Sequence, residues 1–428
     1  MLRPAKSIKT IALCRTKKWK ESPALRDERL NLLAYPKAYL VRGSRFLPQF
    51  LTMSEPSAIQ AALDRAVANG VFPGAVLAVR CGDRPITRFY AGQLSTDPLG
   101  ASVLASTIYD LASLTKPLAT VTSLVLLIQD GKCRFDADLA EYLEEYTESP
   151  IGSATLRDLL THQSGLPGWR GYYERLSPDG VIPSSREDRL RAKQKLLNLI
   201  RSEGMVYERG ARSLYSDLGF MLLGLVVERI SGRPLNEFFS DCIVRRLGKP
   251  RIQFVLSEEL HTFLDSVREV NGGVAPTEVD PWRGRLLCGE VHDQNAGAMG
   301  GEAGHAGLFG NVDAVMAITD EWLRTYHGQS AMLDRDLVRE FTRRQAKGGA
   351  SSWALGWDTP SNPSSAGRRF SAQSFGHLGY TGTSIWVDPV PRLEVVLLSN
   401  RVHPSSRNEA IREFRPMIHD LVYEEFLS

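Results

Sequence analysis

Ser113 and Lys116 form a Ser-x-x-Lys motif, Ser-Leu-Thr-Lys. Residues three apart lie on one face of a helix, so the Lys116 amine can reach the Ser113 hydroxyl. A serine hydroxyl needs an adjacent base to act as a nucleophile, and a lysine serves as that base only where its surroundings lower the pKa of the amine. Free N–H groups at a helix N-terminus would stabilise negative charge on a substrate oxygen. The pattern indicates acyl transfer to serine; the alternative is a helix-capping serine beside a solvated lysine.

Two further motifs follow Ser-x-x-Lys along the chain. Residues 214–218 read Leu-Tyr-Ser-Asp-Leu, at the entrance to an apolar helix, and residues 376–384 read Gly-His-Leu-Gly-Tyr-Thr-Gly-Thr-Ser, before a predicted strand. This order resembles the serine penicillin-binding protein and class C β-lactamase superfamily, which includes esterases, D,D-carboxypeptidases and muramyl-peptide amidases. In that superfamily Ser-x-x-Lys precedes Tyr-x-Asn and then Lys-Thr-Gly or His-x-Gly. The resemblance spans about residues 55–425.

Three further sequence segments support the same resemblance. They are 159–166 (Leu-Leu-Thr-His-Gln-Ser-Gly-Leu), 304–310 (Gly-His-Ala-Gly-Leu-Phe-Gly) and 354–357 (Ala-Leu-Gly-Trp). The stretch 291–310, with the Tyr-Ser-Asp and His-x-Gly motifs, is most similar to a subgroup. That subgroup contains a D-alanyl-D-alanine carboxypeptidase-like penicillin-binding protein and muramyl-peptide amidases.

The resemblance implies a role for each motif residue. Ser113 would attack an acyl carbonyl and form an acyl-enzyme, while Lys116 and Tyr215 would share the proton transfers. The backbone N–H groups of Ser113 and Tyr380 would form the oxyanion hole. Gly379 would let the strand edge approach the substrate.

Two residues depart from the superfamily pattern. Asp217 stands where many relatives have asparagine, and an ionised carboxylate only accepts hydrogen bonds. Beside Lys116 it would keep the amine protonated, which favours Tyr215 as the base, with Lys116 stabilising its phenolate. His377 stands where β-lactamases have a permanent cation, and a neutral imidazole binds a carboxylate poorly at pH 7. An ester or amide substrate is therefore favoured over a β-lactam.

We interpret the remaining candidate site residues as structural. His162 is expected to make a structural hydrogen bond. His292, Asp293 and His305 lack the spacing that zinc sites favour, so we expect them to brace a loop or, for His305, to line the pocket.

Neither a metal nor a cofactor is expected, and the sequence lacks GxSxG, GxxxxGK and GxGxxG motifs. Three tryptophans are expected in the core or the cleft wall: Trp353, Trp357 and Trp386.

Hydrophobic periodicity predicts the elements that must position these residues. An amphipathic helix spans 58–69, and a buried helix over 114–129 places Ser113 at its N-terminus. Strands occur near both ends of the chain, with helices between them. The predicted strands are 74–80, 87–91, 354–357, 375–377, 384–387 and 393–399, and a closing helix spans 408–426.

This order of elements predicts an α/β protein of the α+β type. We expect a β-lactamase-like fold, with an antiparallel sheet built from both chain ends, flanked by helices, and an inserted, mostly helical domain. Residues 53–112 and 312–428 would form the discontinuous α/β domain. Residues 113–311 would form the helical domain, beginning with the Ser-x-x-Lys helix at the interface.

The 428 residues are 43% apolar and 24% charged, which excludes disordered, collagen-like and disulfide-scaffold classes. Residues 1–52 carry twelve Lys or Arg and three acidic residues, a net charge of +9, so the remainder carries −6. This basic segment has no apolar run of secretory length and no nucleic-acid-binding motif. We expect it to be disordered or not native, with Met53 as the start, and we expect no nucleic-acid partner.

Cysteine usage and hydropathy indicate the compartment. The five cysteines are far apart and form no CxxC pair, which is typical of reduced thiols and favours a cytoplasmic location. The apolar stretches 118–128 and 221–227 are shorter than the roughly 18 residues of a membrane span. We expect no transmembrane helix and favour a monomer.

The combined hypothesis is a serine hydrolase that acts through an acyl-enzyme on a small ester or a peptidoglycan-derived peptide. Esterase or muramyl-peptide amidase activity ranks first, D,D-carboxypeptidase activity second and β-lactamase activity third. The alternatives are a weak β-lactamase and a non-turnover sensor or binding protein whose serine stays acylated.

Overall fold

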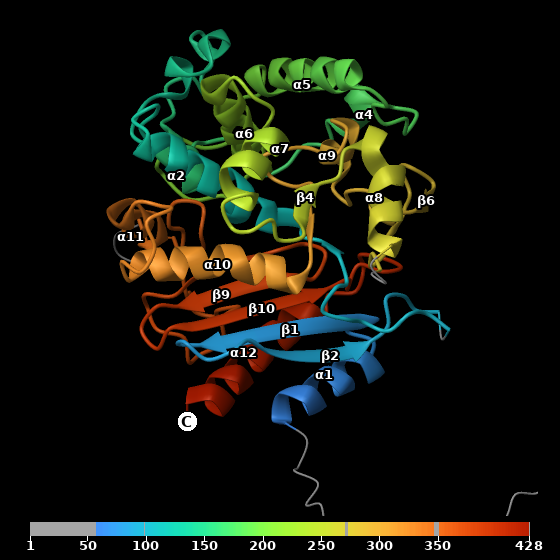
Figure 1. Cartoon of the computed structure of the whole chain (residues 1–428). Coiled ribbons are helices and arrows are strands. Elements are labelled where there is room, and N and C mark those ends of the chain that lie inside the picture. The colour runs from blue at the N-terminus through green and yellow to red at the C-terminus, as the bar shows by residue number, and fades with distance from the viewer. Residues whose placement is uncertain (1–56, 98, 270–272, 346–350, 428) are drawn as a thin grey trace, which may run out of the picture. The chain divides into compact units, whose positions relative to one another are not determined.

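The computed structural model describes residues 57–97, 99–269, 273–345 and 351–427 (Figure 1). These residues belong to one compact unit, Glu55–Ser428. The predictions made for residues 1–52 lie outside the described residues.

A five-stranded antiparallel sheet joins the two ends of this unit. Its order is β2-β1-β10-β9-β8, and β1 pairs with β10 from Ala75 opposite Ser399 to Cys81 opposite Leu393. The predicted antiparallel sheet built from both chain ends is therefore confirmed. The strands are β1 (Gly74–Cys81), β2 (Thr87–Gly92), β8 (Phe375–Leu378), β9 (Ser384–Asp388) and β10 (Leu393–Ser399).

Helices cover both faces of this sheet. Figure 1 shows α1 (Ala58–Ala68) and α12 (Ile411–Leu427) on one side and α10 (Val312–Tyr326) on the other. Side chains of β1 alternate between two cores, because successive residues of a strand point to opposite faces. Leu77 packs in the core beneath α1 and α12, and Val76 packs in the larger core on the α10 side. Burial on both faces explains why every residue of β10 is buried.

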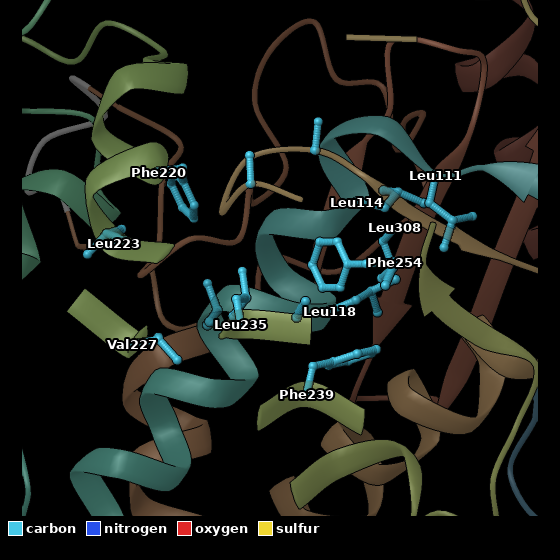
Figure 2. Close-up of a cluster of buried hydrophobic side chains, with 14 of the residues drawn as sticks. Leu111, Leu114, Leu118, Phe220, Leu223, Val227, Leu235, Phe239, Phe254 and Leu308 are labelled. Atoms are coloured by element: carbon cyan, nitrogen blue, oxygen red, sulfur yellow. The ribbon is translucent and has the colours of Figure 1, made fainter. Parts of the chain in front are cut away.

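The larger core lies among the helices beyond α10. Figure 2 shows part of this cluster, with side chains from the segment around Ser113, from α6 (Asp217–Ser231), from α7 (Leu235–Phe239) and from two short strands. The labelled members are Leu111, Leu114, Leu118, Phe220, Leu223, Val227, Leu235, Phe239, Phe254 and Leu308. The helices are α2 (Thr122–Gln129), α3 (Leu156–Leu160), α4 (Tyr173–Leu176), α5 (Arg186–Arg201), α6 (Asp217–Ser231), α7 (Leu235–Phe239), α8 (Leu260–Arg268), α9 (Gln294–Ala298) and α11 (Arg335–Thr342).

Two small sheets, which the sequence patterns did not predict, complete this part. One has the order β3-β7-β4 and the other is the hairpin β5-β6. The strands are β3 (Tyr109–Asp110), β4 (Ile252–Phe254), β5 (Val279–Asp280), β6 (Arg285–Leu286) and β7 (Leu308–Gly310). The domain boundaries given above remain predictions.

The strand predicted at 354–357 is wrong. These residues form a tight turn in which the Ala354 N–H donates to Trp357 O at 2.8 Å. Gly356 adopts a φ of +82°, a left-handed conformation that interrupts an extended strand. The turn brings Gly356 so close to Val121 that a Cβ atom would collide with it.

Within the described residues, one helical segment, Ala112–Gln129, is long and apolar enough to cross a membrane. The apolar stretch 118–128 within it is shorter than the whole segment, because the segment also includes Ser113, Lys116 and several threonines. Since 83% of the segment is buried inside the protein, it serves as a core helix.

Candidate active site

Ser113 lies directly after a strained backbone position. Ala112 has a φ of +48°, a conformation that costs a non-glycine residue on the order of 1–3 kcal/mol. The buried Asp110 stabilises the backbone at Ala112. Its Oδ1 accepts from the Ala112 N–H at 2.8 Å, and its Oδ2 accepts from the His292 N–H at 2.6 Å. Burial raises the pKa of Asp110, and those two N–H groups oppose this effect. Sequence reasoning missed Asp110, which comes four residues before the helix predicted at 114–129.

The helix that follows is not uniform. A 3₁₀ turn over Ala112–Leu114 leads into a π-helical turn over Lys116–Val121 and then into α2. Such π turns are rare and frequently occur at functional sites. The predicted continuous helix therefore begins with two irregular turns, and these carry Ser113 and Lys116.

Lys116 is completely buried and joins three groups. Its Nζ donates to Ser113 Oγ at 2.9 Å, to Asp217 Oδ1 at 2.7 Å and to His305 O at 3.2 Å. Burial lowers the pKa of Lys116, but Asp217 and Tyr215 raise it further, so the pKa lies above its ordinary value. The amine is therefore a cation at neutral pH and acts as a donor to Ser113.

Tyr215 precedes α6, whose N-terminus is capped by the Ser216 hydroxyl. The Lys116 Nζ lies 4.8 Å from the centroid of the Tyr215 ring, and the Tyr215 hydroxyl interacts with both Lys116 and Ser113. Burial raises the pKa of Tyr215 and outweighs the opposing effect of Lys116. The direction of this shift favours a neutral Tyr215 hydroxyl over the phenolate expected from the sequence.

The turn between β8 and β9 is tied to the segment before Ser113. Thr381 Oγ1 donates to Asp110 O at 2.7 Å, and Thr383 Oγ1 donates to Leu111 O at 3.2 Å. Tyr380 is 55% exposed, and its backbone N–H donates to no protein acceptor within the described ranges. This N–H is available to a substrate, as the oxyanion-hole assignment requires.

Gly379 lets the turn between β8 and β9 pack closely against the segment before Ser113. A Cβ atom there would collide with the Thr383 side chain and lie 2.8 Å from Leu111 O. We expect Gly379→Ala to displace the Tyr380 N–H and to lower kcat by about 10²–10³, the effect of losing one oxyanion donor. The measurement is steady-state kinetics with an ester substrate. Gly204→Ala is the control, because a Cβ atom at Gly204 has nothing within 4 Å; equal kinetics for the two variants would contradict the prediction.

His377 is neutral and presents an acceptor. Burial, with help from Lys116, lowers its pKa from 6.5 to about 3. Its Nδ1 lies 2.9 Å from Leu378 O, so Nδ1 carries the proton and Nε2 is the acceptor. Nε2 is buried without a protein partner in the described part of the chain. His377 therefore provides no cation for a substrate carboxylate.

The neutral state of His377 makes a prediction for stability. On unfolding, its pKa returns from about 3 to 6.5, so below pH 6.5 the unfolded chain takes up a proton and stability falls. Between pH 7 and pH 5 this loss amounts to about 2 kcal/mol. Chemical denaturation at the two pH values should show that His377→Asn loses less stability than the wild type by that amount. An identical pH dependence in both proteins would show that His377 accepts a proton in the folded state.

The histidines of the 291–310 loop are braced by carboxylates. His305 Nε2 lies 2.8 Å from Asp293 Oδ1, and His292 Nε2 lies 2.8 Å from Glu278 Oε2. Burial raises the pKa of Asp293, but His305 lowers it further, so the carboxyl stays ionised. Among the described residues, no group of three or more His, Cys, Asp or Glu is placed to hold a metal ion.

These groups line one cavity. Its volume is about 750 Å³, a size typical of small-molecule sites. It is lined by Ser113, Tyr215, Asp217, His305, His377, Gly379 and Tyr380, and also by Trp169, Trp353, Arg401 and Arg415. Every residue singled out from the sequence for the site lies on this cavity except Lys116, which is buried directly behind Ser113.

His162 packs against Tyr215, and the other two tryptophans singled out from the sequence lie in the core. His162 Nδ1 accepts from the Ser216 N–H at 3.0 Å, and its ring centroid lies 4.7 Å from that of Tyr215. His162 thus supports the Tyr215 segment, in line with the structural hydrogen bond expected for it. Trp357 and Trp386 are fully buried in the core.

Comparison with known proteins gives the family of the chain. Residues 59–415 match the family described as Beta-lactamase. A protein of Escherichia coli (strain K12) named "Putative D-alanyl-D-alanine carboxypeptidase" is 32% identical over 311 residues, which is 69% of this chain and 70% of that protein.

Solved structures share the fold at lower identity. "EstCE1, a hydrolase with promiscuous acyltransferase activity" has a TM-score of 0.66 at 21% identity, covering 85% of this chain and 97% of that chain. Unliganded simvastatin synthase (LovD) from Aspergillus terreus has a TM-score of 0.63 at 19% identity, covering 86% of this chain and 98% of that chain.

The matched family spans the sheet, the Ser-x-x-Lys helix and the turn after β8. The chain therefore belongs to the beta-lactamase family, within the superfamily of serine β-lactamase-like hydrolases and penicillin-binding proteins that its motifs resemble.

Proposed function

We propose that this protein hydrolyses a small ester or a peptidoglycan-derived peptide amide through an acyl-enzyme on Ser113. The observation that carries the proposal is the position of Lys116. Its amine contacts Ser113 and Asp217, whose side chains line the same cavity as Tyr215. The alternative, a helix-capping serine beside a solvated lysine, requires an exposed amine, whereas Lys116 is completely buried.

The first half-reaction forms the bond from Ser113 Oγ to the acyl carbon. The Ser113 proton passes to the Tyr215 oxygen while the neutral Tyr215 hydroxyl gives its own proton to the leaving oxygen or nitrogen. The bond from the acyl carbon to the leaving group then breaks. The Lys116 cation stabilises negative charge that develops on Ser113 and Tyr215 during this transfer.

The second half-reaction uses water. Water attacks the acyl carbon and passes a proton through Tyr215 to Ser113 Oγ. The bond from Ser113 Oγ to the acyl carbon breaks, and the acid is released. In both halves, the carbonyl oxygen carries negative charge toward the backbone N–H groups of Ser113 and Tyr380. A preorganised donor of this kind is worth about 10²–10³ in rate.

The states of the motif residues His377 and Asp217 support an ester or amide over a β-lactam. His377 is neutral and offers only an acceptor at Nε2, and Asp217 accepts from Lys116. We rank esterase or muramyl-peptide amidase activity first and D,D-carboxypeptidase activity, which the name of the Escherichia coli relative supports, second.

Two measurements test the proposal. Intact-mass spectrometry with a fluorophosphonate probe should show one adduct on the wild type. Parallel assays with p-nitrophenyl esters, nitrocefin, a D-Ala-D-Ala peptide and a muramyl peptide should then show turnover of an ester or a peptide, with nitrocefin slower. Absence of an adduct would overturn the mechanism. A stable adduct with no turnover of any substrate would favour the acylated sensor.

A further inference from the structure

Arg415 contacts the turn that carries the Tyr380 N–H. It lies on α12, is 6% exposed, and lines the cavity. Its Nη2 donates to Gly379 O and to Thr383 O, both at 2.8 Å. These two carbonyls lie at the two ends of the turn, so one guanidinium group fixes both.

The Gly379 carbonyl and the Tyr380 N–H belong to the same peptide unit. A trans peptide is planar, so its C=O and N–H point in opposite directions. A cation bound to the oxygen therefore fixes the direction of the N–H and increases its partial positive charge, because hydrogen bonds along a chain polarise one another.

We propose that Arg415 is a positioning residue that orients and polarises the Gly379–Tyr380 peptide so that the Tyr380 N–H stabilises the substrate oxyanion. This inference rests on the proposed function. It adds a residue that no motif of the superfamily resemblance includes.

The charge environment of Arg415 agrees with this role. In the described part of the chain its charged neighbour is Arg401, another cation, and its Nε has no protein partner. Burial and Arg401 lower the pKa of Arg415 to about 9, which leaves it a cation at neutral pH. A buried cation without a carboxylate costs stability, so an apolar residue would serve helix packing better.

Arg401 acts on a different peptide unit. Its Nε donates to Tyr380 O at 2.9 Å, an oxygen that shares its peptide with the Thr381 N–H. Arg401 therefore supports the turn without polarising the Tyr380 N–H. This difference assigns the proposed role to Arg415 alone.

The test compares Arg415→Met with the wild type on an ester substrate. We expect kcat to fall by about 10–100-fold with KM nearly unchanged, since a weakened donor costs less than the 10²–10³ of a lost one. The affinity of phenylboronic acid, whose tetrahedral adduct on Ser113 places negative charge in the oxyanion hole, should fall by the same factor. Arg415→Lys, which keeps the charge, should recover part of both.

Ile418→Ala is the matched control. Ile418 is fully buried on the same helix and packs in the core beneath the sheet, so this variant should melt at a lower temperature and keep kcat. Should Arg415→Met fail to fold, Arg415→Lys still tests the proposal, because kcat and boronate affinity should fall together there.

Three outcomes would overturn the role of Arg415. They are an unchanged kcat in the Arg415 variants, a change in KM alone, and an equal loss of kcat in Ile418→Ala. A wild type that neither labels with fluorophosphonate nor turns over any substrate would instead overturn the proposed function.

Discussion

The Ser113→Ala variant should lose ester or amide turnover by about 10⁵–10⁶-fold, the scale seen when a serine nucleophile is removed. The Ser113 hydroxyl is the group that the buried Lys116 contacts on the cavity wall, and without it no acyl-enzyme forms. The measurement combines kcat/KM with intact mass after fluorophosphonate treatment. The variant should show no adduct while its melting temperature stays close to that of the wild type.

Ser123→Ala is the matched control for this experiment. Ser123 is fully buried on α2, and its hydroxyl has no hydrogen-bond partner among the described residues. Its removal should leave labelling and turnover unchanged. An adduct that persists in Ser113→Ala would place the nucleophile elsewhere and contradict the mechanism.

Replacing Tyr215 with phenylalanine should lower kcat by about 10²–10⁴, the usual contribution of a positioned proton-transfer group. The substitution removes the oxygen that relays the proton between Ser113 and the leaving group. The ring remains packed against His162 and Trp353, and the ion pair between Lys116 and Asp217 is retained. Steady-state kinetics should show the loss mainly in kcat, with the melting temperature little changed.

The control for this variant is Tyr109→Phe. The Tyr109 hydroxyl is buried without a partner in the described part of the chain, so its loss should not alter turnover. Near-normal kcat in Tyr215→Phe would show that Lys116 alone handles the proton, which requires it to lose its proton despite Asp217.

Much of the fold was predictable because its elements have strong local patterns. Strands β1 and β10 are apolar runs bounded by turns, and the structure pairs them in one sheet. The error at 354–357 has a physical cause: Gly356 takes a left-handed conformation to fit against Val121. Alternation of apolar residues cannot reveal such a constraint. The short strands β3, β4 and β7 have at most three residues each, too few to show a periodicity.

The site was predictable as a set of motifs but not as an arrangement of charges. The motifs named Ser113, Lys116, Tyr215 and His377, and the structure gathers them at one cavity. The motifs did not indicate Asp110 or Arg415. Both act through backbone groups of segments distant in the chain, and a hydrogen bond to a backbone atom leaves no pattern of residue types.

The sequence by itself determined which reactive groups the protein has and their order, because side-chain identity is covalent and Ser-x-x-Lys places its two groups within one helical turn. Only the tertiary structure decided their protonation. The pKa of Lys116 depends on burial and on Asp217, which is 101 residues away. The pKa of His377 depends on burial and on the distant Lys116. Desolvation and charge pairing are properties of the folded surroundings, so no local pattern contains them.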